Sequence, residues 1–365
     1  MDSVSSDEVY QDQILPHVSR TFALTIPQLP EGLRAPVTSA YLLCRIADTI
    51  EDEPALSPPE TLAFLQRFST VLAGQGAAGP LAQEIAQRLS DRTVATERDL
   101  VSNMERVIRV MARFNEPQRV AIQRCVELMC YGMPRFQFSA SLNGLATSGD
   151  LDDYCYYVAG VVGEMLTELF CEYSPEIARH RPALSALAAS FAQGLQMTNI
   201  LKDVWEDRSR GACWLPQDVF TRHGVILAQV SSEPFDPRFG DAYRELIGVA
   251  HAHLRNALDY TLLIPGREIG IRRFCLWAVG LAVLTLRKIE RNPRFTAGVQ
   301  VKVPRSAVAM TRLFTDAAGR SDSMLRLLLA MAARGLPLAR LTDLRRPRPA
   351  PGSPHAFHHS YGNSR

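Results

Sequence analysis

Apolar residues recur at three- and four-residue spacing along almost the whole chain, which is the period of a helix that buries one face. Strand-like alternation is confined to one short segment, residues 298–304. The pattern predicts an all-α protein, with helices over residues 33–50, 60–73, 81–90, 97–113, 116–132, 150–173, 183–205, 239–262, 271–291, 304–317 and 321–334.

Proline and glycine clusters separate the predicted helices. Neither an internal repeat nor a linker interrupts the chain before residue 343, so we expect one all-helical domain over residues 1–342. The tail, residues 343–365, is rich in Pro, Arg, His, Ser and Gly, and we expect it to be disordered because it cannot bury enough apolar surface. Its arginines could touch anionic lipid, or the tail could be a solvated end without a partner.

One glycine cluster has the spacing of a nucleotide-binding fingerprint. Gly74, Gly76 and Gly79 match G-x-G-x-x-G, which works only where a strand leads into the glycines and a helix follows them. Here the preceding residues 64–72 have helical periodicity, and Pro80 is expected to open the next helix. We therefore interpret this segment as a loop between two helices.

Composition and charge argue against several functions. The chain has 365 residues, 47% of them hydrophobic, and a formal net charge of only +2, which gives no support for nucleic-acid binding. Seven cysteines without C-x-x-C spacing indicate reduced thiols in a reducing compartment. The N-terminus is acidic, unlike a signal peptide, and no uninterrupted apolar run reaches the length of a membrane span. We expect a cytoplasmic protein, and the oligomeric state stays open.

The most informative feature is a pair of acidic clusters, each at the end of an apolar helix. Asp48, Glu51 and Asp52 stand at i, i+3 and i+4, so their carboxylates share one helical face and repel one another. Asp203 and Asp207 repeat this spacing at the end of another apolar helix. Like charges in this arrangement indicate that something cationic offsets them.

Carboxylate faces of this kind suit hard cations. Mg²⁺ keeps several waters and is usually held by one or two carboxylates together with phosphate oxygens of a substrate. Two facing clusters would therefore clamp a diphosphate through Mg²⁺ and promote its departure as a leaving group. The alternative is that each cluster is a solvated helix end that forms surface salt bridges with Arg45 or Arg208.

An aromatic helix supplies material for an apolar cavity. Residues 153–163 include Tyr154 and two further tyrosines together with Gly160 and Gly163. Aromatic faces can stabilise a carbocation, and a phenol hydroxyl can relay a proton. Glycine permits a close helix crossing or leaves room for a bulky apolar substrate. The alternative is a packed core helix with its tyrosines at the surface.

Four segments together resemble the squalene/phytoene synthase family. They are SRTF at 19–22, YLLCRIADTIED at 41–52, YCYYVAGVVG at 154–163 and QMTNILKDVWED at 196–207. Their order and spacing fit as well, and the likeness runs from about residue 15 to residue 320. The resemblance implies the isoprenoid synthase fold, a single helical domain around a central active-site cavity.

The resemblance also implies roles for individual residues. The sites for Mg²⁺ and diphosphate would be formed by Asp48, Glu51, Asp52, Asp203 and Asp207. Tyr154 falls where the family has its proposed general acid/base tyrosine. The groups around the diphosphates would be Arg20, Thr21, Phe22, Arg45 and Lys202, and the pocket would be lined by Tyr41, Val158, Val162, Gln196 and Asn199.

In this family, condensation of two prenyl diphosphates gives a cyclopropyl diphosphate that has two fates. Squalene synthases ionise it again and quench the final cation with hydride from NADPH, whereas phytoene and dehydrosqualene synthases lose a proton and need no reductant. The chain resembles the squalene branch in Phe274-Cys275 and in the basic stretch with Lys302 and Arg305, which we expect to bind NADPH. The family's proline-glutamine pair after Phe-Cys is replaced here by Ala278-Val279.

The sequence therefore predicts a Mg²⁺-dependent transferase that joins two farnesyl diphosphates to squalene through presqualene diphosphate, with NADPH as reductant. One alternative is a non-reductive phytoene- or dehydrosqualene-type synthase, which Ala278 and Val279 favour. Another is a non-catalytic relative that acts as an assembly factor, which we would expect to lose carboxylates that this chain keeps. The choice between C15 and C20 substrates stays open. Peripheral membrane contact is expected because the product is a hydrocarbon.

Overall fold

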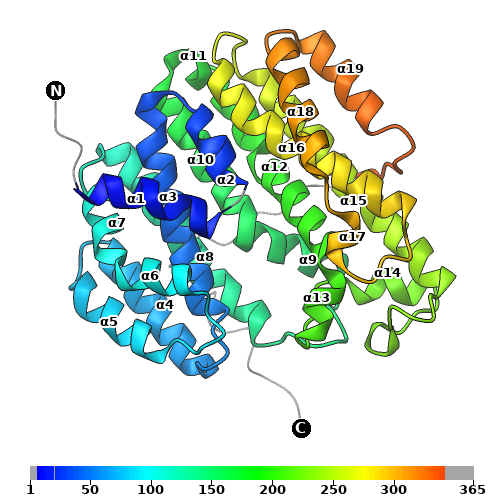
Figure 1. The fold of residues 1–365 in the computed structure, drawn as a ribbon, viewed down its shortest axis with the longest axis horizontal. Helices are drawn as coiled ribbons and strands as arrows, with labels where there is room; N and C mark the ends of the chain where they lie inside the picture. The colour runs from blue at the N-terminus through cyan, green and yellow to red at the C-terminus, as the bar shows by residue number, and fades with distance from the viewer. Residues whose placement is uncertain (1–5, 20, 342–365) are drawn as a thin grey trace.

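The computed structural model describes residues 6–19 and 21–341, and in these ranges the chain is a bundle of helices without a β-strand (Figure 1). The elements are α1 (Ser6–Val18), α2 (Phe22–Thr25), η1 (Ile26–Gln28), α3 (Glu31–Glu51), α4 (Pro58–Leu72), α5 (Ala78–Arg88), α6 (Ala95–Ser102), α7 (Met104–Met111), α8 (Glu116–Gln137), α9 (Ser148–Cys155), η2 (Tyr156–Gly160), α10 (Val161–Tyr173), α11 (Pro175–Ala178), α12 (Arg181–Lys202), α13 (Val204–Ser209), α14 (Gln217–Arg222), η3 (Leu227–Gln229), α15 (Pro237–Leu263), α16 (Ile269–Arg291), α17 (Gly298–Val301), α18 (Arg305–Ala318) and α19 (Asp322–Ala332).

The predicted all-α fold is confirmed, and the predicted helices are found with shifted ends. The segment 97–113 is divided at Asn103 into α6 and α7. The segment 150–173 contains a π-helical turn, η2, between α9 and α10. Such turns widen a helix locally and often occur at functional sites. The segment 183–205 ends at Lys202, where α13 follows after a single residue.

The strand candidate at 298–304 is wrong. Residues Gly298–Val301 form the short helix α17, and the backbone then runs out to Pro304 without a partner strand. A lone strand would leave its backbone N–H groups unsatisfied, whereas here the amide of Gly298 donates to Oε1 of Glu206 at 2.7 Å. This side-chain acceptor anchors the start of α17, so the alternating valines adopt a helical turn instead.

The interior of the bundle is built around α12, which packs against α15, α10, η2 and α16. The crossing of α10 and α12 is close because Gly163 has no side chain: a β-carbon there would overlap the carbonyl oxygen of Ala188. This bears out the interpretation that glycine permits a close helix crossing. The loop reading of the Gly74–Gly79 cluster is confirmed for Gly74 and Gly76, which lie between α4 and α5 at φ +81° and +109°. Gly79 lies in the first turn of α5, which begins at Ala78 and not at Pro80 as expected.

One helix, α16, is long and apolar enough to cross a membrane by length and composition alone. Our search for an uninterrupted apolar run did not detect it. In the folded chain 61% of its apolar stretch is buried, against α12, α15 and other helices. We therefore treat α16 as a core helix of the bundle.

Candidate active site

The first acidic cluster occupies the last turn of α3. Asp48 and Glu51 belong to the helix, and Asp52 is its C-cap residue, with its amide donating to the carbonyl of Asp48 at 2.8 Å. Burial raises the pKa of Asp48 to about 7, against the opposing charge of Arg45. Burial also raises the pKa values of Glu51 and Asp52. The charges of Asp52 and Asp48 raise the pKa of Glu51 further, whereas the cations of Arg45 and Arg210 oppose the rise at Asp52.

The second cluster lies where α12 ends and α13 begins. Asp203 is the single residue between the two helices, and its Oδ2 forms an ion pair with Nζ of Lys202 at 2.8 Å. Asp207 lies one turn later, and its amide donates to the carbonyl of Asp203 at 2.9 Å. Burial raises the pKa of Asp207 to about 6, and the negative charge of Asp203 adds to this effect.

The two clusters are about 150 residues apart in the sequence. In the fold they lie close enough for the charge of one to shift a pKa in the other. The charge of Asp52 raises the pKa of Asp207, and the cation of Arg210 lowers the pKa of both. Sequence reasoning did not select Arg210, which follows α13 and belongs to no recognised motif. The predicted acidic faces are therefore close enough to belong to one site.

Tyr154 is the third component of this site. Its ring stacks on Trp214, with centroids 4.4 Å apart and planes inclined by 10°, and it meets the ring of Phe136 in a T-shaped arrangement with centroids 5.4 Å apart. Burial raises the pKa of its hydroxyl well above the usual value, and the negative charges of Glu51, Asp52 and Asp207 raise it further. Both acidic clusters thus act on the same phenol. Trp214, which lies in the loop between α13 and α14, was not anticipated.

The salt-bridge alternative for the clusters is supported only in part. Arg208 donates to the backbone carbonyls of Leu227 and Val230, at 2.9 and 2.6 Å, and forms no ion pair with a described carboxylate. Arg45 lies 3.9 Å from Asp48, but its hydrogen-bonded partner is Glu97 of α6. Asp48 and Asp203 thus each have one ion-pair partner, whereas Glu51, Asp52 and Asp207 form no ion pair within the described residues.

A metal would have to share these carboxylates with other oxygen donors. No group of three or more His, Cys, Asp or Glu among the described residues is arranged to hold a metal ion unaided. Mg²⁺ commonly binds through one or two carboxylates, waters and substrate phosphates, so it does not require such a group. Burial is the main cause that raises the pKa values of Asp48 and Asp207, and neighbouring carboxylates add to it, so a divalent cation would favour the charged forms of both. The donor set fits Mg²⁺.

Comparison with known proteins identifies the family of the chain. A family model described as squalene/phytoene synthase matches residues 15–307. The chain belongs to the squalene/phytoene synthase family. Squalene synthase ERG9 of Gibberella zeae is 29% identical over 280 residues, which are 75% of this chain and 57% of that protein. Squalene synthase ERG9 of Candida albicans is 30% identical over 296 residues, 79% of this chain and 63% of that protein. The chain thus spans less than two thirds of the length of these relatives.

A solved structure has a similar fold. The complex of TcSQS with the ligand BPH1237 matches with a TM-score of 0.73 and 23% identity, over 90% of this chain and 92% of that one. The fold is therefore that of the isoprenoid synthases, as the resemblance in the sequence implied.

Within this family fold, the N-terminal motif lies against two distant helices. The ring of Phe22 is 5.0 Å from that of Tyr41 in α3 and 6.3 Å from that of Phe274 in α16. The hydroxyl of Tyr41 donates to the carbonyl of Val18 at 3.0 Å. Thr21, immediately before α2, is exposed. Arg20 lies outside the described residues.

Four of the five predicted lining residues come from elements that pack together. Val158 belongs to η2 and Val162 to α10, and both elements contact α12, which carries Gln196 and Asn199 near its C-terminal end. Val158, Val162 and Gln196 are half-buried and Asn199 is exposed. All four thus retain accessible surface, and Gln196 and Asn199 do so on the helix that leads to the second acidic cluster.

The residues expected to bind NADPH lie in two groups. Phe274 and Cys275 are buried near the start of α16, with Phe274 against Phe22 and Phe170. Lys302 is exposed, and its carbonyl accepts a hydrogen bond from Lys288 near the other end of the same helix. Phe274 and Lys288 are 14 positions apart, which at 1.5 Å per residue is about 20 Å. The role of these residues in binding NADPH stays a prediction.

Proposed function

We propose that this chain condenses two farnesyl diphosphates head to head to presqualene diphosphate and reduces this intermediate to squalene with NADPH. The observation that carries the proposal is the convergence of both acidic clusters on Tyr154, whose pKa responds to Glu51 and Asp52 from α3 and to Asp207 from α13. A site with two carboxylate faces around one phenol suits the ionisation of an allylic diphosphate.

In the proposed reaction, the basic residues beside each cluster bind diphosphate oxygens. Arg45 is held by Glu97 beside Asp48, and Lys202 is held by Asp203. Mg²⁺, bound by the aspartates and the diphosphate, would supply the positive charge that stabilises the leaving group. The raised pKa values of Asp48 and Asp207 fit a site that needs this charge.

Tyr154 is proposed to hold and transfer a proton. Because burial and the neighbouring carboxylates raise the pKa of its hydroxyl, Oη carries its proton at neutral pH and can donate it to a departing diphosphate oxygen. The stacking on Trp214 orients the ring. The aromatic faces of Tyr154, Phe136 and Trp214 can also stabilise positive charge on an allylic substrate.

The reductive half of the proposal rests on the likeness of Phe274-Cys275 to the squalene branch of the family. The position of the family's proline-glutamine pair is held here by Ala278, half-buried, and Val279, fully buried. This substitution favours the second candidate function, a synthase that ends in proton loss and gives dehydrosqualene or phytoene without NADPH.

Product analysis decides between these functions. The protein is incubated with farnesyl diphosphate and Mg²⁺, with and without NADPH, and the extract is examined by gas chromatography–mass spectrometry after removal of diphosphates. Squalene that forms only with NADPH supports the proposal. Dehydrosqualene in both incubations, or phytoene from geranylgeranyl diphosphate, establishes the non-reductive reaction instead.

A variant separates catalysis from a merely retained scaffold. Asp203→Asn removes a charge from a half-buried carboxylate without altering the core, so the fold should persist while condensation is lost. Near-normal turnover in a correctly folded Asp203→Asn variant would refute the metal-clamp role. We further propose that the protein acts in the cytoplasm at the membrane surface, because a hydrocarbon product must leave for an apolar phase.

A further inference from the structure

A small pocket lies on the outside of the bundle, between the C-terminal half of α16 and the start of α18. Its volume is 240 Å³, and it is lined by Leu284, Arg287, Lys288, Arg291, Val303, Pro304 and Ala307. The four residues from α16 stand at i, i+3, i+4 and i+7, so they form one continuous stripe of that helix. At 100° per residue, this stripe points about 110° away from Phe274 and Ala278. The pocket therefore lies on a different face of α16 from these two residues, and it is lined by none of the acidic residues of the candidate active site.

The pocket gathers positive charge without a matching carboxylate. No acidic side chain lines it, and Arg287, Lys288 and Arg291 form no ion pair with a carboxylate of the described chain. Lys288 donates to the carbonyl of Lys302 at 2.7 Å. The Nε atom of Arg287 is buried without a hydrogen-bond partner, although Nη1 reaches the carbonyl of Ala332 at 3.4 Å. An unsatisfied buried donor among three cations indicates an anionic ligand.

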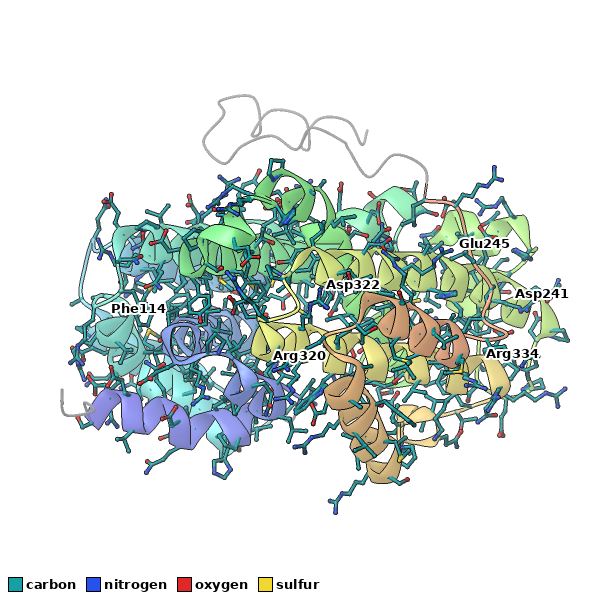
Figure 2. The ribbon with its side chains drawn as sticks, turned by 90° about the horizontal axis from the view of Figure 1, so that it is seen from above. Phe114, Asp241, Glu245, Arg320, Asp322 and Arg334 are labelled. Carbon is teal, nitrogen blue, oxygen red and sulfur yellow. The ribbon has the colours of Figure 1, made fainter. Side chains whose placement is uncertain are left out.

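The nearby carboxylates are already paired elsewhere. Asp316 of α18 pairs with Arg273 at 2.7 Å, and Asp322 of α19 pairs with Arg272 at 2.8 Å. Glu290 of α16 pairs with Arg244 of α15 at 2.7 Å. Figure 2 shows Asp322 and Arg320 at the junction of α18 and α19, on the outside of the bundle. The cations of the pocket are therefore not neutralised by these acids.

An exposed apolar stripe continues from the pocket along α18. Ala307 lines the pocket, and Met310 and Phe314 follow at i+3 and i+7 on the same side of the helix, with Leu313 beside them. Met310, Leu313 and Phe314 are 46%, 60% and 47% exposed, which is unusual for three large apolar residues within two turns of a helix. The adjoining α19 also exposes Met324, Leu327 and Met331.

We propose that the α16–α18 pocket and the exposed stripe of α18 dock the protein on an anionic phospholipid surface. The three cations receive a lipid headgroup phosphate, and Met310, Leu313 and Phe314 enter the interfacial layer beside it. Cations next to an apolar stripe match the two parts of a phospholipid, whereas a soluble phosphate would use only the pocket. This proposal rests on the membrane contact proposed above and names the surface that makes it. Vesicle binding needs no catalysis, so the docking surface and the proposed reaction can fail independently.

Sedimentation with vesicles tests the docking surface. Wild-type protein should bind vesicles of phosphatidylcholine and phosphatidylglycerol at 3:1, and should bind pure phosphatidylcholine vesicles much more weakly. Arg287→Gln with Arg291→Gln should weaken binding to the anionic vesicles by roughly 30-fold, since each cation near such a surface contributes about a factor of five. Leu313→Ser with Phe314→Ser should weaken it by roughly tenfold, and both side chains are exposed enough to be replaced without unfolding.

A matched control removes the same charge elsewhere. Arg222→Gln with Arg238→Gln replaces two exposed arginines that pair with Glu245 and Asp236, and this variant should bind within about threefold of wild type. Equal losses in both arginine pairs would show a general charge effect and overturn the proposal, as would unchanged binding of the pocket variant. A higher KM for NADPH with unchanged vesicle binding would assign the pocket to a nucleotide phosphate instead. If Arg287 and Arg291 only offset the dipole of α16, their double variant should have a lower melting temperature while its vesicle binding persists, which would overturn the proposal.

Discussion

The ring of Tyr154 lies parallel to that of Trp214, 4.4 Å between centroids, at the point where the charges of both acidic clusters act on its hydroxyl. Removing that hydroxyl leaves the stack in place. Tyr154→Phe should therefore keep the melting temperature within about 1 °C of wild type while turnover of farnesyl diphosphate falls by about 10²- to 10⁴-fold, the usual worth of a general acid. Trp214→Leu is the complementary variant, and it should lower both stability and turnover. Normal turnover in Tyr154→Phe would remove the phenol from the mechanism.

Arg45 donates a hydrogen bond to Glu97. Glu97 belongs to α6, a helix that the sequence alone did not connect with the site. The Arg45 and Glu97 side chains are 33% and 17% exposed, so the pair is partly shielded from solvent. Glu97→Gln should leave Arg45 poorly oriented and lower kcat/KM for farnesyl diphosphate about tenfold, with most of the change in KM. Steady-state kinetics measure this, and Glu97→Asp should restore part of the loss. A change in melting temperature without any change in KM would show that Glu97 is structural only.

Asp7 joins α1 to α7 and gives the stability of the fold a defined pH dependence. Its Oδ1 and Oδ2 atoms accept from Nε of Arg106 and of Arg109, each at 2.9 Å, and the hydrogen bond from Arg109 is the main cause that lowers the pKa of Asp7 to about 2. A lowered folded-state pKa means that the unfolded chain takes up the proton first as pH falls. This stabilisation is therefore present above about pH 4 and is lost progressively towards pH 2.

Asp7→Asn should consequently lower the free energy of unfolding by about 1 to 2 kcal/mol at pH 7 and by almost nothing at pH 2. Urea unfolding at several pH values between 2 and 7 measures the difference. An equal loss at both ends of this range would contradict the assignment, since it would locate the cost of the substitution outside the titration of Asp7.

Gly163 and Gly32 form a matched pair of helical glycines. A β-carbon at Gly163 would meet the backbone of Ala188, whereas one at Gly32 would make ordinary contacts at 3.5 Å with the ring of Tyr173. Gly163→Ala should therefore destabilise the protein by about 1 to 3 kcal/mol, because the backbone of α12 cannot yield easily. Gly32→Ala should be neutral or stabilising by up to about 1 kcal/mol, since alanine favours the helix. Thermal unfolding of both variants tests the contrast, and similar values would rule out the close crossing.

The sequence was sufficient for the fold class and for both acidic clusters because each depends on a helical period. Asp48, Glu51 and Asp52 are three and four positions apart, so any helix through them places their carboxylates on one face. Trp214, Glu97 and Arg210 could not be found in this way, because each reaches the site from another segment and none stands in a periodic pattern.

One error of the sequence-based reading has a physical cause as well. The alternating valines at 299–303 have the period of a strand, but Glu206 fixes the start of a helical turn through the amide of Gly298. This acceptor comes from a helix that is distant in sequence, so the residue types of the segment itself do not show it.

The crossing at Gly163 also limits how the active site can adapt to other substrates. With no side chain between the backbones of α10 and α12, the two helices have nothing to compress and must move as one body. Under the proposed function, a longer prenyl chain would therefore not be admitted by spreading this pair of helices. Selection for substrate length would be left to side chains on them, such as those of Val158 and Val162, and relatives that accept other chain lengths should differ in the volume of these side chains.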